Sequence, residues 1–513
     1  MKEKILFFSA VILASVLRLF LIIRDSVPFA YDMGRDLLWA KDLAFYHIPT
    51  LIGPAASIWG VYFGPLWFYF LAPPLALSGG NPQSAVWITA AAIVLTGILA
   101  YLLFKKYLSG LYALALAIIF LFSYTLINIS TFAFHANVLP ILTLIMIYFC
   151  FLATVKNPSY LAASFLAVSL MFHADPAPAV ALTLAPVAIF FYFKLFRLKS
   201  LKKTVFLSVL AYLIPFIPQI LFEVRNNFVE VRSLIAYFLG QNPSLSGKLP
   251  PIERIFNRLD IFFDFFKNSF AGGNNAVGVV FLAMTVFGIY KFLKHQKNQN
   301  LVSLFKINLF VLTVAFLMFT FPITVEIKNW YLYGLVIPLG LLIVFALYGF
   351  RRPGPVLPLF LAAYLAVNLW PLFSQRRIQQ AKNDPAQLAN QLGAIDLVYE
   401  DAASLPFSVY TFTPVIYDLN WQYLFWWQGI KLKKGLPLDF AYLPSQPAYV
   451  RNKNIYARNA PLSKTADVIY LIIENGKENE FYTRADWLKN FKNYRLIWQT
   501  DIDRAITVEK RSK

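Results

Sequence analysis

The sequence predicts an all-α polytopic membrane domain of about 11–13 transmembrane helices, followed by a C-terminal soluble α/β or α+β domain. Of 513 residues, 59% are hydrophobic and 14% are charged, a composition that soluble domains do not have. Apolar runs of about 20 residues, the length that crosses a bilayer, recur from position 5 to position 373. Polar residues dominate afterwards, so we divide the chain into a membrane domain, 1–373, and a soluble domain, 374–513.

The first apolar run, 5–23, follows Lys2 and Lys4 and could be mistaken for a cleaved signal peptide. It is longer than the apolar core of such peptides, and no small-residue cleavage site precedes Arg24. We interpret it as a retained span with a cytoplasmic amino terminus. The further candidate spans are 61–78, 85–104, 111–128, 136–155, 159–173, 177–196, 205–222, 274–293, 304–321, 330–349 and 354–373.

Basic residues in short loops indicate the orientation, because such loops remain on the cytoplasmic side. The strongest are KLFRLKSLKK (194–203), KFLKHQK (291–297) and FRRP (350–353). They place 223–273 and everything after about 374 outside, in a cytoplasmic membrane.

Strict alternation through all the candidate spans places the same basic loops outside, so one early segment is miscounted. One suspect is 61–78, which is broken by Pro65, Pro73 and Pro74. The other is 111–128. Either segment could be re-entrant or split.

The net charge of +20 does not indicate nucleic acid, because much of the excess lies in cytoplasmic loops and in the tail, next to anionic lipid headgroups. Cys150 is the only cysteine, which excludes a disulfide framework and a thiol metal site. It is best interpreted as a small core residue.

The soluble domain begins with helical spacing in QRRIQQAKNDPAQLANQLGAID (375–396). The runs FSVYTFTPV (407–415), ADVIYLIIE (466–474) and IWQTDIDRAITVEK (497–510) are typical of strands. The domain has no glycine-rich phosphate loop, zinc pattern or nucleophile elbow, so the sequence assigns it no chemistry.

The stretch YDMGRDLLWAKDL (31–43) gathers charges in an otherwise apolar chain: Asp32, Arg35, Asp36, Lys41 and Asp42. If 32–44 is a short helix at the membrane surface, the first three share a face because they are three and four positions apart. Its apolar side would rest in the interface, with Trp39 at headgroup depth; the residues are Leu37, Leu38, Trp39, Leu43 and Phe45. The stretch is then either an ordinary interfacial helix or a set of carboxylates presented to a lipid-linked substrate.

The following stretch, TLIGPAASIWGVYFGPLWFYFLAPP (50–74), is rich in glycine and proline and carries Trp59, Tyr62, Trp67 and Tyr69. Aromatic loops of this kind form sugar-stacking walls and interfacial anchors alike.

The block YDMGRD…LIGPAAS…GVYFGPLWFYFLAPP resembles the integral-membrane glycosyltransferases of the GT-C superfamily. It is most similar to the branch of protein O-mannosyltransferases and lipid A aminoarabinose transferases, whose bacterial members show F-D-x-G-R-D…L-I-G-P…G-P-L-x-Y-Y. Three other stretches are consistent with that branch: FHANVLPILTL (134–144), ILFEVRNNF (220–228) and NWYLYGLVIPLGLLI (329–343). The likeness covers 1–373 as architecture and is sharp only over 31–74. Met33 follows Asp32 where most members have an Asp-Glu pair.

The resemblance implies a GT-C fold, with the acidic motif in an outer loop, 24–60. It also implies inverting transfer of a hexose or pentose from a polyprenyl-phosphate sugar to an acceptor hydroxyl on the outer face. Asp32 matches the family's loop-one aspartate and is the expected general base. Asp36 is the second candidate, or a partner that fixes Asp32 and Arg35.

Cations must hold the departing phosphate, and the candidates are Arg225, Lys328 and Arg35. Arg225 and Lys328 are equally interpretable as headgroup anchors at span ends. His135 and His173, at outer ends of spans, are candidate substrate contacts, although a lone histidine is more often structural. Trp59 and Tyr62 are candidate sugar contacts.

No cofactor or divalent metal is expected, since two histidines and scattered carboxylates do not make a metal site. The expected partners are the lipid-linked donor, membrane lipids and an acceptor glycan, lipid or protein. A flippase or other transporter of lipid-linked sugars is the alternative function; it would show internal repeats and polar residues at mid-membrane. A catalytically inactive scaffold would lose nothing on replacement of Asp32.

Overall fold

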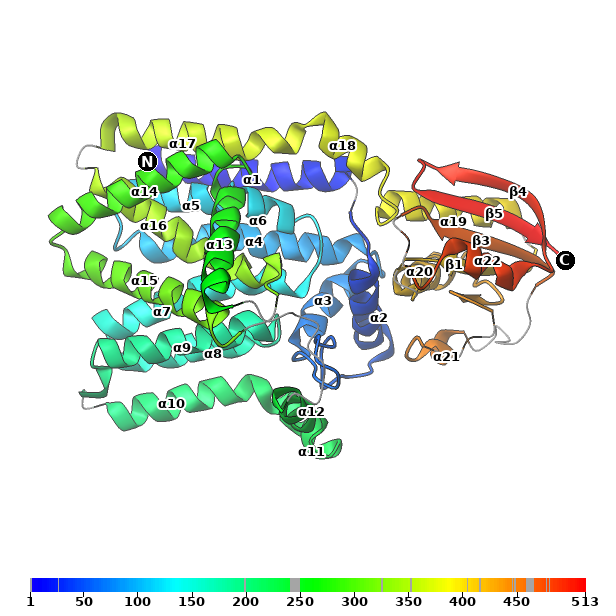
Figure 1. Ribbon diagram of the computed structural model, residues 1–513, viewed down its shortest axis with the longest axis horizontal. Coiled ribbons are helices and arrows are strands. Elements are labelled where there is room, and N and C mark those ends of the chain that lie inside the picture. The colour runs from blue at the N-terminus through cyan, green and yellow to red at the C-terminus, as the bar shows by residue number, and fades with distance from the viewer. Residues whose placement is uncertain are drawn as a thin grey trace.

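The computed structural model describes residues 2–25, 27–197, 200–239, 250–323, 326–350, 353–403, 405–414, 417–444, 446, 449–457, 466–476, 478 and 480–513. A bundle of helices occupies one part of the molecule, and a smaller domain with a sheet projects from one end of it (Figure 1). The helices of the first part are α1 (Lys2–Asp25), α2 (Tyr31–Tyr46), α3 (Leu66–Leu77), α4 (Gln83–Phe104), α5 (Gly110–Leu121), α6 (Tyr124–Ile129), α7 (Leu139–Val155), α8 (Leu161–Met171), α9 (Pro176–Tyr192), α10 (Leu201–Leu213), α11 (Ile217–Arg225), α12 (Val229–Phe238), α13 (Pro251–Phe270), α14 (Asn275–His295), α15 (Gln299–Thr320), α16 (Val336–Gly349) and α17 (Pro353–Leu369).

The polytopic membrane domain is confirmed, because eight helices in the described part of the chain are long and apolar enough to cross a bilayer. They are Lys2–Arg24, Gln83–Phe104, His135–Val155, Leu201–Arg225, Asn275–His295, Gln299–Thr320, Asn329–Gly349 and Gly354–Gln380. Four shorter apolar helices accompany them: Leu66–Leu77, Gly110–Leu121, Pro158–Met171 and Pro176–Tyr192. Each candidate span from the sequence coincides with one of these helices.

The miscounted segment is 61–78. Its helix α3 has 12 residues and rises about 18 Å, which is too short for a hydrocarbon core of about 30 Å. Both ends of α3 also lie at the same end of the bundle. Trp67, at its start, hydrogen-bonds Asp36 of α2, and Gly80, just after its end, accepts a hydrogen bond from Tyr423 of the C-terminal domain. We call this end of the bundle, where α2, α3 and the C-terminal domain lie, the domain face.

The second suspect, 111–128, is split into α5 and α6 but crosses the bundle as a pair. Gly110, at the start of α5, packs against Glu3 near the amino terminus. Asn128, near the end of α6, accepts a hydrogen bond at 2.7 Å from Arg377 of α18 (Gln375–Lys382). With α3 removed from the count, alternation places the carboxyl-terminal ends of α9, α14 and α16, near which the basic stretches lie in the sequence, at the same end as the amino terminus. The conflict in the sequence-based topology therefore disappears.

The C-terminal domain is a mixed α/β domain, as predicted. The five strands among its described residues are ordered β2-β1-β3-β5-β4; β2, β1 and β3 are parallel, whereas β5 is antiparallel to both β3 and β4. Asp503 and Arg504, with positive φ of 45° and 58°, form the tight turn between β4 and β5. The elements are α18 (Gln375–Lys382), α19 (Leu388–Ala402), β1 (Ser408–Phe412), α20 (Leu419–Trp426), β2 (Phe440–Ala441), α21 (Lys453–Tyr456), β3 (Val468–Glu474), α22 (Arg484–Leu488), β4 (Arg495–Ile502) and β5 (Ile506–Ser512).

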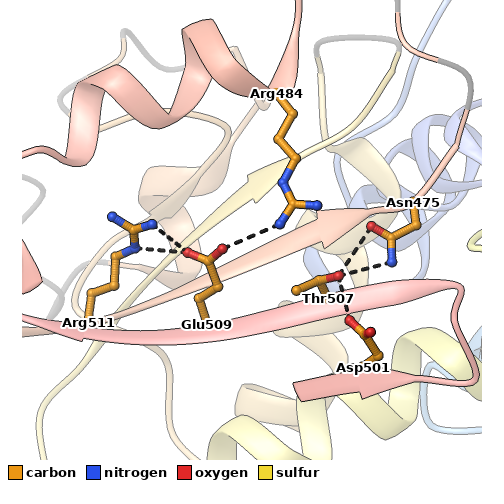
Figure 2. Close-up of polar contacts among 6 residues, drawn as sticks. All are labelled: Asn475, Arg484, Asp501, Thr507, Glu509 and Arg511. Atoms are coloured by element: carbon orange, nitrogen blue, oxygen red, sulfur yellow. Dashed lines mark hydrogen bonds and ion pairs between the residues drawn. The ribbon is translucent and has the colours of Figure 1, made fainter. Parts of the chain in front are cut away.

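Successive side chains of strand β5 point to opposite faces of the sheet, and the two faces have different surroundings. Ile506 and Val508 belong to a core that also contains residues of α2, α3, α19 and α20, so this face of the sheet is continuous with the membrane domain. The opposite face carries the polar cluster of Figure 2, in which buried Glu509 is paired with Arg511 at 2.7 Å and with Arg484 at 3.4 Å. This cluster therefore neutralises a buried carboxylate on the side of the sheet that faces away from α2.

Candidate functional site

The charges of 31–43 divide into two groups on α2. In the first, Arg35 bridges two carboxylates: its Nη1 lies 2.8 Å from Asp32 Oδ1, and its Nη2 and Nε each lie 2.8 Å from Asp36 Oδ1. The three residues share a face of the helix, as their spacing predicts. The group carries one net negative charge at the domain face of the bundle.

The two carboxylates have different environments. Asp36 is 1% exposed, and its second oxygen accepts a hydrogen bond from the indole of Trp67 at 2.8 Å. Burial raises its pKa to about 6, although Arg35 and Trp67 oppose the rise. The Asp32 side chain is 53% exposed and contacts Arg35 through one oxygen only. Asp32 is therefore the carboxylate that can meet a substrate, and Asp36 is the one that fixes Arg35.

Lys41 and Asp42 form the second group and have a different role. The Lys41 ammonium is fully buried and lies 2.6 Å from Asp42 Oδ1, while Asp42 Oδ2 accepts a hydrogen bond from Asn452 at 2.7 Å. The ammonium also lies 4.6 Å from the ring centre of Tyr456. Since Asn452 and Tyr456 belong to the C-terminal domain, this pair joins that domain to α2.

The expected lipid-facing side of α2 packs against other parts of the protein instead. Leu37 and Leu38 belong to the core shared with α20, and Trp39 stacks on Phe68 of α3 with ring centres 5.3 Å apart. Trp39 is thus packed against protein on one side, and its place at headgroup depth stays a prediction. The sequence alone does not show that a soluble domain, 370 residues further along, covers this helix.

The close contact between α2 and α20 depends on Gly34. A Cβ at this position would lie 2.3 Å from both the Cα and the backbone nitrogen of Asn420. Only glycine allows the two backbones to approach so closely. The contact holds the start of α20 directly over the turn of α2 that carries Asp32 and Arg35.

His135 and His173 lie together beneath the loop that joins α2 to α3. His135 is 5% exposed with its ring 4.8 Å from that of Phe63, and Arg35 is near enough to act on it electrostatically. His173 is 3% exposed and packs against Gly64, where a Cβ would lie 1.8 Å from its Nδ1. Burial lowers the pKa of His173 to about 4, so it is neutral at physiological pH. Both histidines support the loop that carries the aromatic residues.

Tyr62 is fixed to the α11–α12 segment. Its backbone N–H donates to Glu230 at 3.2 Å, and its carbonyl accepts from Gln219 at 3.2 Å. Burial raises the pKa of Glu230 to about 7, and neighbouring Glu223 raises it further. Arg225 belongs to the same segment and is exposed. The structure therefore holds Tyr62 against the segment that carries Arg225, although the two residues are far apart in the sequence.

Two further predicted residues have exposed side chains. Trp59 is 89% exposed, and Lys328 forms an exposed ion pair with Glu326 at 2.6 Å. Within the described residues, no three His, Cys, Asp or Glu side chains gather as a metal site. The absence of a metal requirement stays a prediction.

Sequence reasoning did not include three residues in the site. Trp67 was grouped only with the other aromatic residues, although an indole N–H is a frequent partner for a buried carboxylate. Glu230 and Asp175 have no motif of their own. Asp175 is 3% exposed and caps α9 by accepting from the Ala177 N–H at 3.1 Å, and a histidine two positions earlier was the only signal.

No family model and no curated protein matches the chain. Among solved structures, the chain is similar to ArnT from Cupriavidus metallidurans in the apo state, with a TM-score of 0.61 and 12% identity over 99% of this chain and 97% of that one. For the same protein bound to undecaprenyl phosphate, the TM-score is 0.59, with the same identity and coverage. The Archaeoglobus fulgidus oligosaccharyltransferase AglB superposes less well, with a TM-score of 0.43 and 11% identity over 92% of this chain and 70% of that one. The chain thus has the GT-C fold that its sequence predicts, including the C-terminal domain.

Proposed function

We propose that this protein is a glycosyltransferase that moves a sugar from a polyprenyl-phosphate donor to an acceptor hydroxyl. The observation that carries the proposal is an exposed carboxylate, fixed by an arginine, at the domain face of a bundle that shares its fold with a protein crystallised with undecaprenyl phosphate. The positive-inside rule supports placing this face outside, in a bacterial or archaeal cytoplasmic membrane.

The reaction is a single displacement. The acceptor oxygen bonds to the anomeric carbon from the side opposite the phosphate, and the bond from that carbon to the phosphate oxygen breaks, leaving its electron pair on the phosphate. The configuration at the anomeric carbon therefore inverts. The hydroxyl proton passes to Asp32, which is exposed and held by Arg35.

The other residues of the group position Asp32 and hold the phosphate. Asp36 keeps the Arg35 guanidinium in place from the buried side, since both oxygens of Asp36 are occupied by Arg35 and Trp67. Arg225 is the exposed cation that we assign to the departing phosphate. The mechanism does not require a divalent ion, so transfer should continue in excess chelator.

The test is transfer of radiolabelled sugar from a panel of polyprenyl-phosphate hexoses and pentoses in proteoliposomes. Asp32→Asn should reduce transfer at least about 100-fold, the usual contribution of a general base. Asp264→Asn is the matched control, because Asp264 is 60% exposed and also pairs with a basic residue three positions away. If Asp32→Asn transferred sugar as fast as the wild type, Asp32 would not be the general base. If the donor moved between leaflets in every variant and no sugar was transferred, the protein would be a flippase of lipid-linked sugars instead.

A further inference from the structure

Three tyrosines of the C-terminal domain form a cluster of rings. Tyr417 lies 5.4 Å from Tyr449 and 5.5 Å from Tyr442, and Tyr442 lies 5.2 Å from Tyr449, as measured between ring centres. Tyr417 is the outermost of the three and is 43% exposed. A ring of this size that is left open to solvent beside two others offers a flat apolar surface.

A buried polar network holds the cluster in one arrangement. Asp418, 1% exposed, accepts hydrogen bonds from the Tyr449 hydroxyl and from Gln422, the latter at 3.0 Å. Gln422 also donates to the Phe440 carbonyl at 2.8 Å, and the Tyr449 oxygen accepts from the Tyr442 N–H at 3.3 Å. The rings are therefore fixed before any ligand arrives, which lowers the entropy lost on binding.

The cluster lies next to the acidic group of α2. The contact of Gly34 with Asn420 brings the two helices together, and Tyr31 and Tyr417 each precede their contact residue by three positions. Tyr417 is near enough to Tyr31 to raise its pKa, although burial of Tyr31 is the larger cause. Tyr31 is followed directly by Asp32. The open ring of Tyr417 and the exposed carboxylate of Asp32 therefore lie on neighbouring parts of one surface, which the two domains share.

This arrangement fits a carbohydrate. The axial C–H groups of a pyranose present an apolar face that packs on an aromatic ring, while its hydroxyl groups point outward from the ring edge. We propose that Tyr417, supported by Tyr442 and Tyr449, is the wall on which the pyranose ring of the acceptor lies, with a free hydroxyl directed to Asp32. This inference rests on the proposed function and makes it more specific, since the acceptor is a glycan or glycolipid and not a serine or threonine of a protein.

The test measures binding separately from chemistry. Full-length protein in lipid nanodiscs is titrated with methyl pyranosides of glucose, mannose, galactose and N-acetylglucosamine, and with a serine- and threonine-rich peptide, and saturation-transfer NMR follows each ligand. The experiment is run in the Asp32→Asn background, in which transfer is expected to be at least about 100-fold slower. Tyr417→Ala should weaken pyranoside binding about 10-fold, the upper end of the contribution of one aromatic contact.

Two further variants distinguish contact from folding. Tyr417→Phe keeps the ring and should bind as the parent does, and Phe481→Ala removes an aromatic residue that is 95% exposed on the same domain and should change nothing. Pyranoside binding that is absent in the parent, equal in Tyr417→Ala, or weaker than binding of the peptide would overturn the inference. Failure of the proposed function would appear in a different measurement, as absence of transfer in the wild type with intact pyranoside binding.

Discussion

Removal of the Asp42 carboxylate should release the C-terminal domain from α2. In Asp42→Ala the Lys41 ammonium would remain fully buried without its counter-ion, and breaking a buried pair in this way costs about 3–5 kcal/mol. Cation–π attraction to the surrounding aromatic rings would still stabilise the Lys41 ammonium by about 1 kcal/mol. The nearest ring centre lies 4.6 Å away. The net loss is then about 2–4 kcal/mol, which shifts the docking equilibrium roughly 30-fold to 700-fold toward the undocked form.

Hydrogen exchange measured by mass spectrometry in nanodiscs detects this shift, because burial between the domains should protect the amides of α2 and α20 more strongly in the docked form. A double variant, Lys41→Met with Asp42→Ala, should recover most of the protection, since replacing both charges leaves none unpaired. The control is Asp396→Ala, which removes an ion pair of the same 2.6 Å length that is half-exposed and therefore contributes little. If Asp42→Ala exchanged no faster than Asp396→Ala, or if the double variant exchanged as fast as the single, the ion pair would not hold the domains together.

Three further predictions follow from the same contacts. Gly34→Ala should speed exchange in α20 despite its better helix propensity, because the added Cβ meets the Asn420 backbone at 2.3 Å and the two helices must separate. Gly64→Ala should lower the melting temperature and the transfer rate together, since His173 occupies the space of the new methyl group, and unchanged values of both would contradict the packing. The pKa of Asp36 is about 6 in the folded protein, above the ordinary 3.8, so its contribution to stability is complete below about pH 4 and is lost as the pH rises through 6. Activity should change in the opposite direction, falling as the pH drops below 6 and the carboxylate is neutralised; a pH–rate profile with no step near 6, or the same step in Asp36→Asn, would argue against this assignment.

The membrane part of the fold could be predicted from the sequence because span length and composition are local properties. Each of the predicted apolar segments contains a helix. The runs 407–415 and 466–474 contain β1 and β3, and the run 497–510 covers most of the β4–β5 hairpin. The sequence could not show that 61–78 does not cross the membrane, since the composition of this segment is that of a span. What prevents α3 from crossing is its length after Pro65 and the contacts of both its ends with α2 and α20.

For the charged stretch 31–43 too, part of the arrangement could be predicted from the sequence and part could not. That Asp32, Arg35 and Asp36 share one face follows from helical spacing alone. Which of the two carboxylates is buried depends on Trp67, and the role of Lys41 depends on Asn452 and Tyr456, which are separated from it by hundreds of residues. Contacts at such separations leave no trace in the local pattern, so the sequence could not distinguish a lipid-facing helix from one that is covered by a domain.

The charge of the acidic group decides which cation can hold the donor phosphate. Arg35 is bound by two carboxylates, so the group as a whole is negative and repels a phosphate. Lys328 is paired with Glu326, which leaves the exposed Arg225, on the segment that also fixes Tyr62, as the cation we assign to this role. Arg225→Ala should therefore raise the KM for donor about 10-fold, the usual value of one charged hydrogen bond, and leave the KM for acceptor unchanged. Lys328→Ala is the control and should alter neither. If Arg35 held the phosphate instead, Asp32→Asn would free its guanidinium and tighten donor binding, and Arg225→Ala would have no effect.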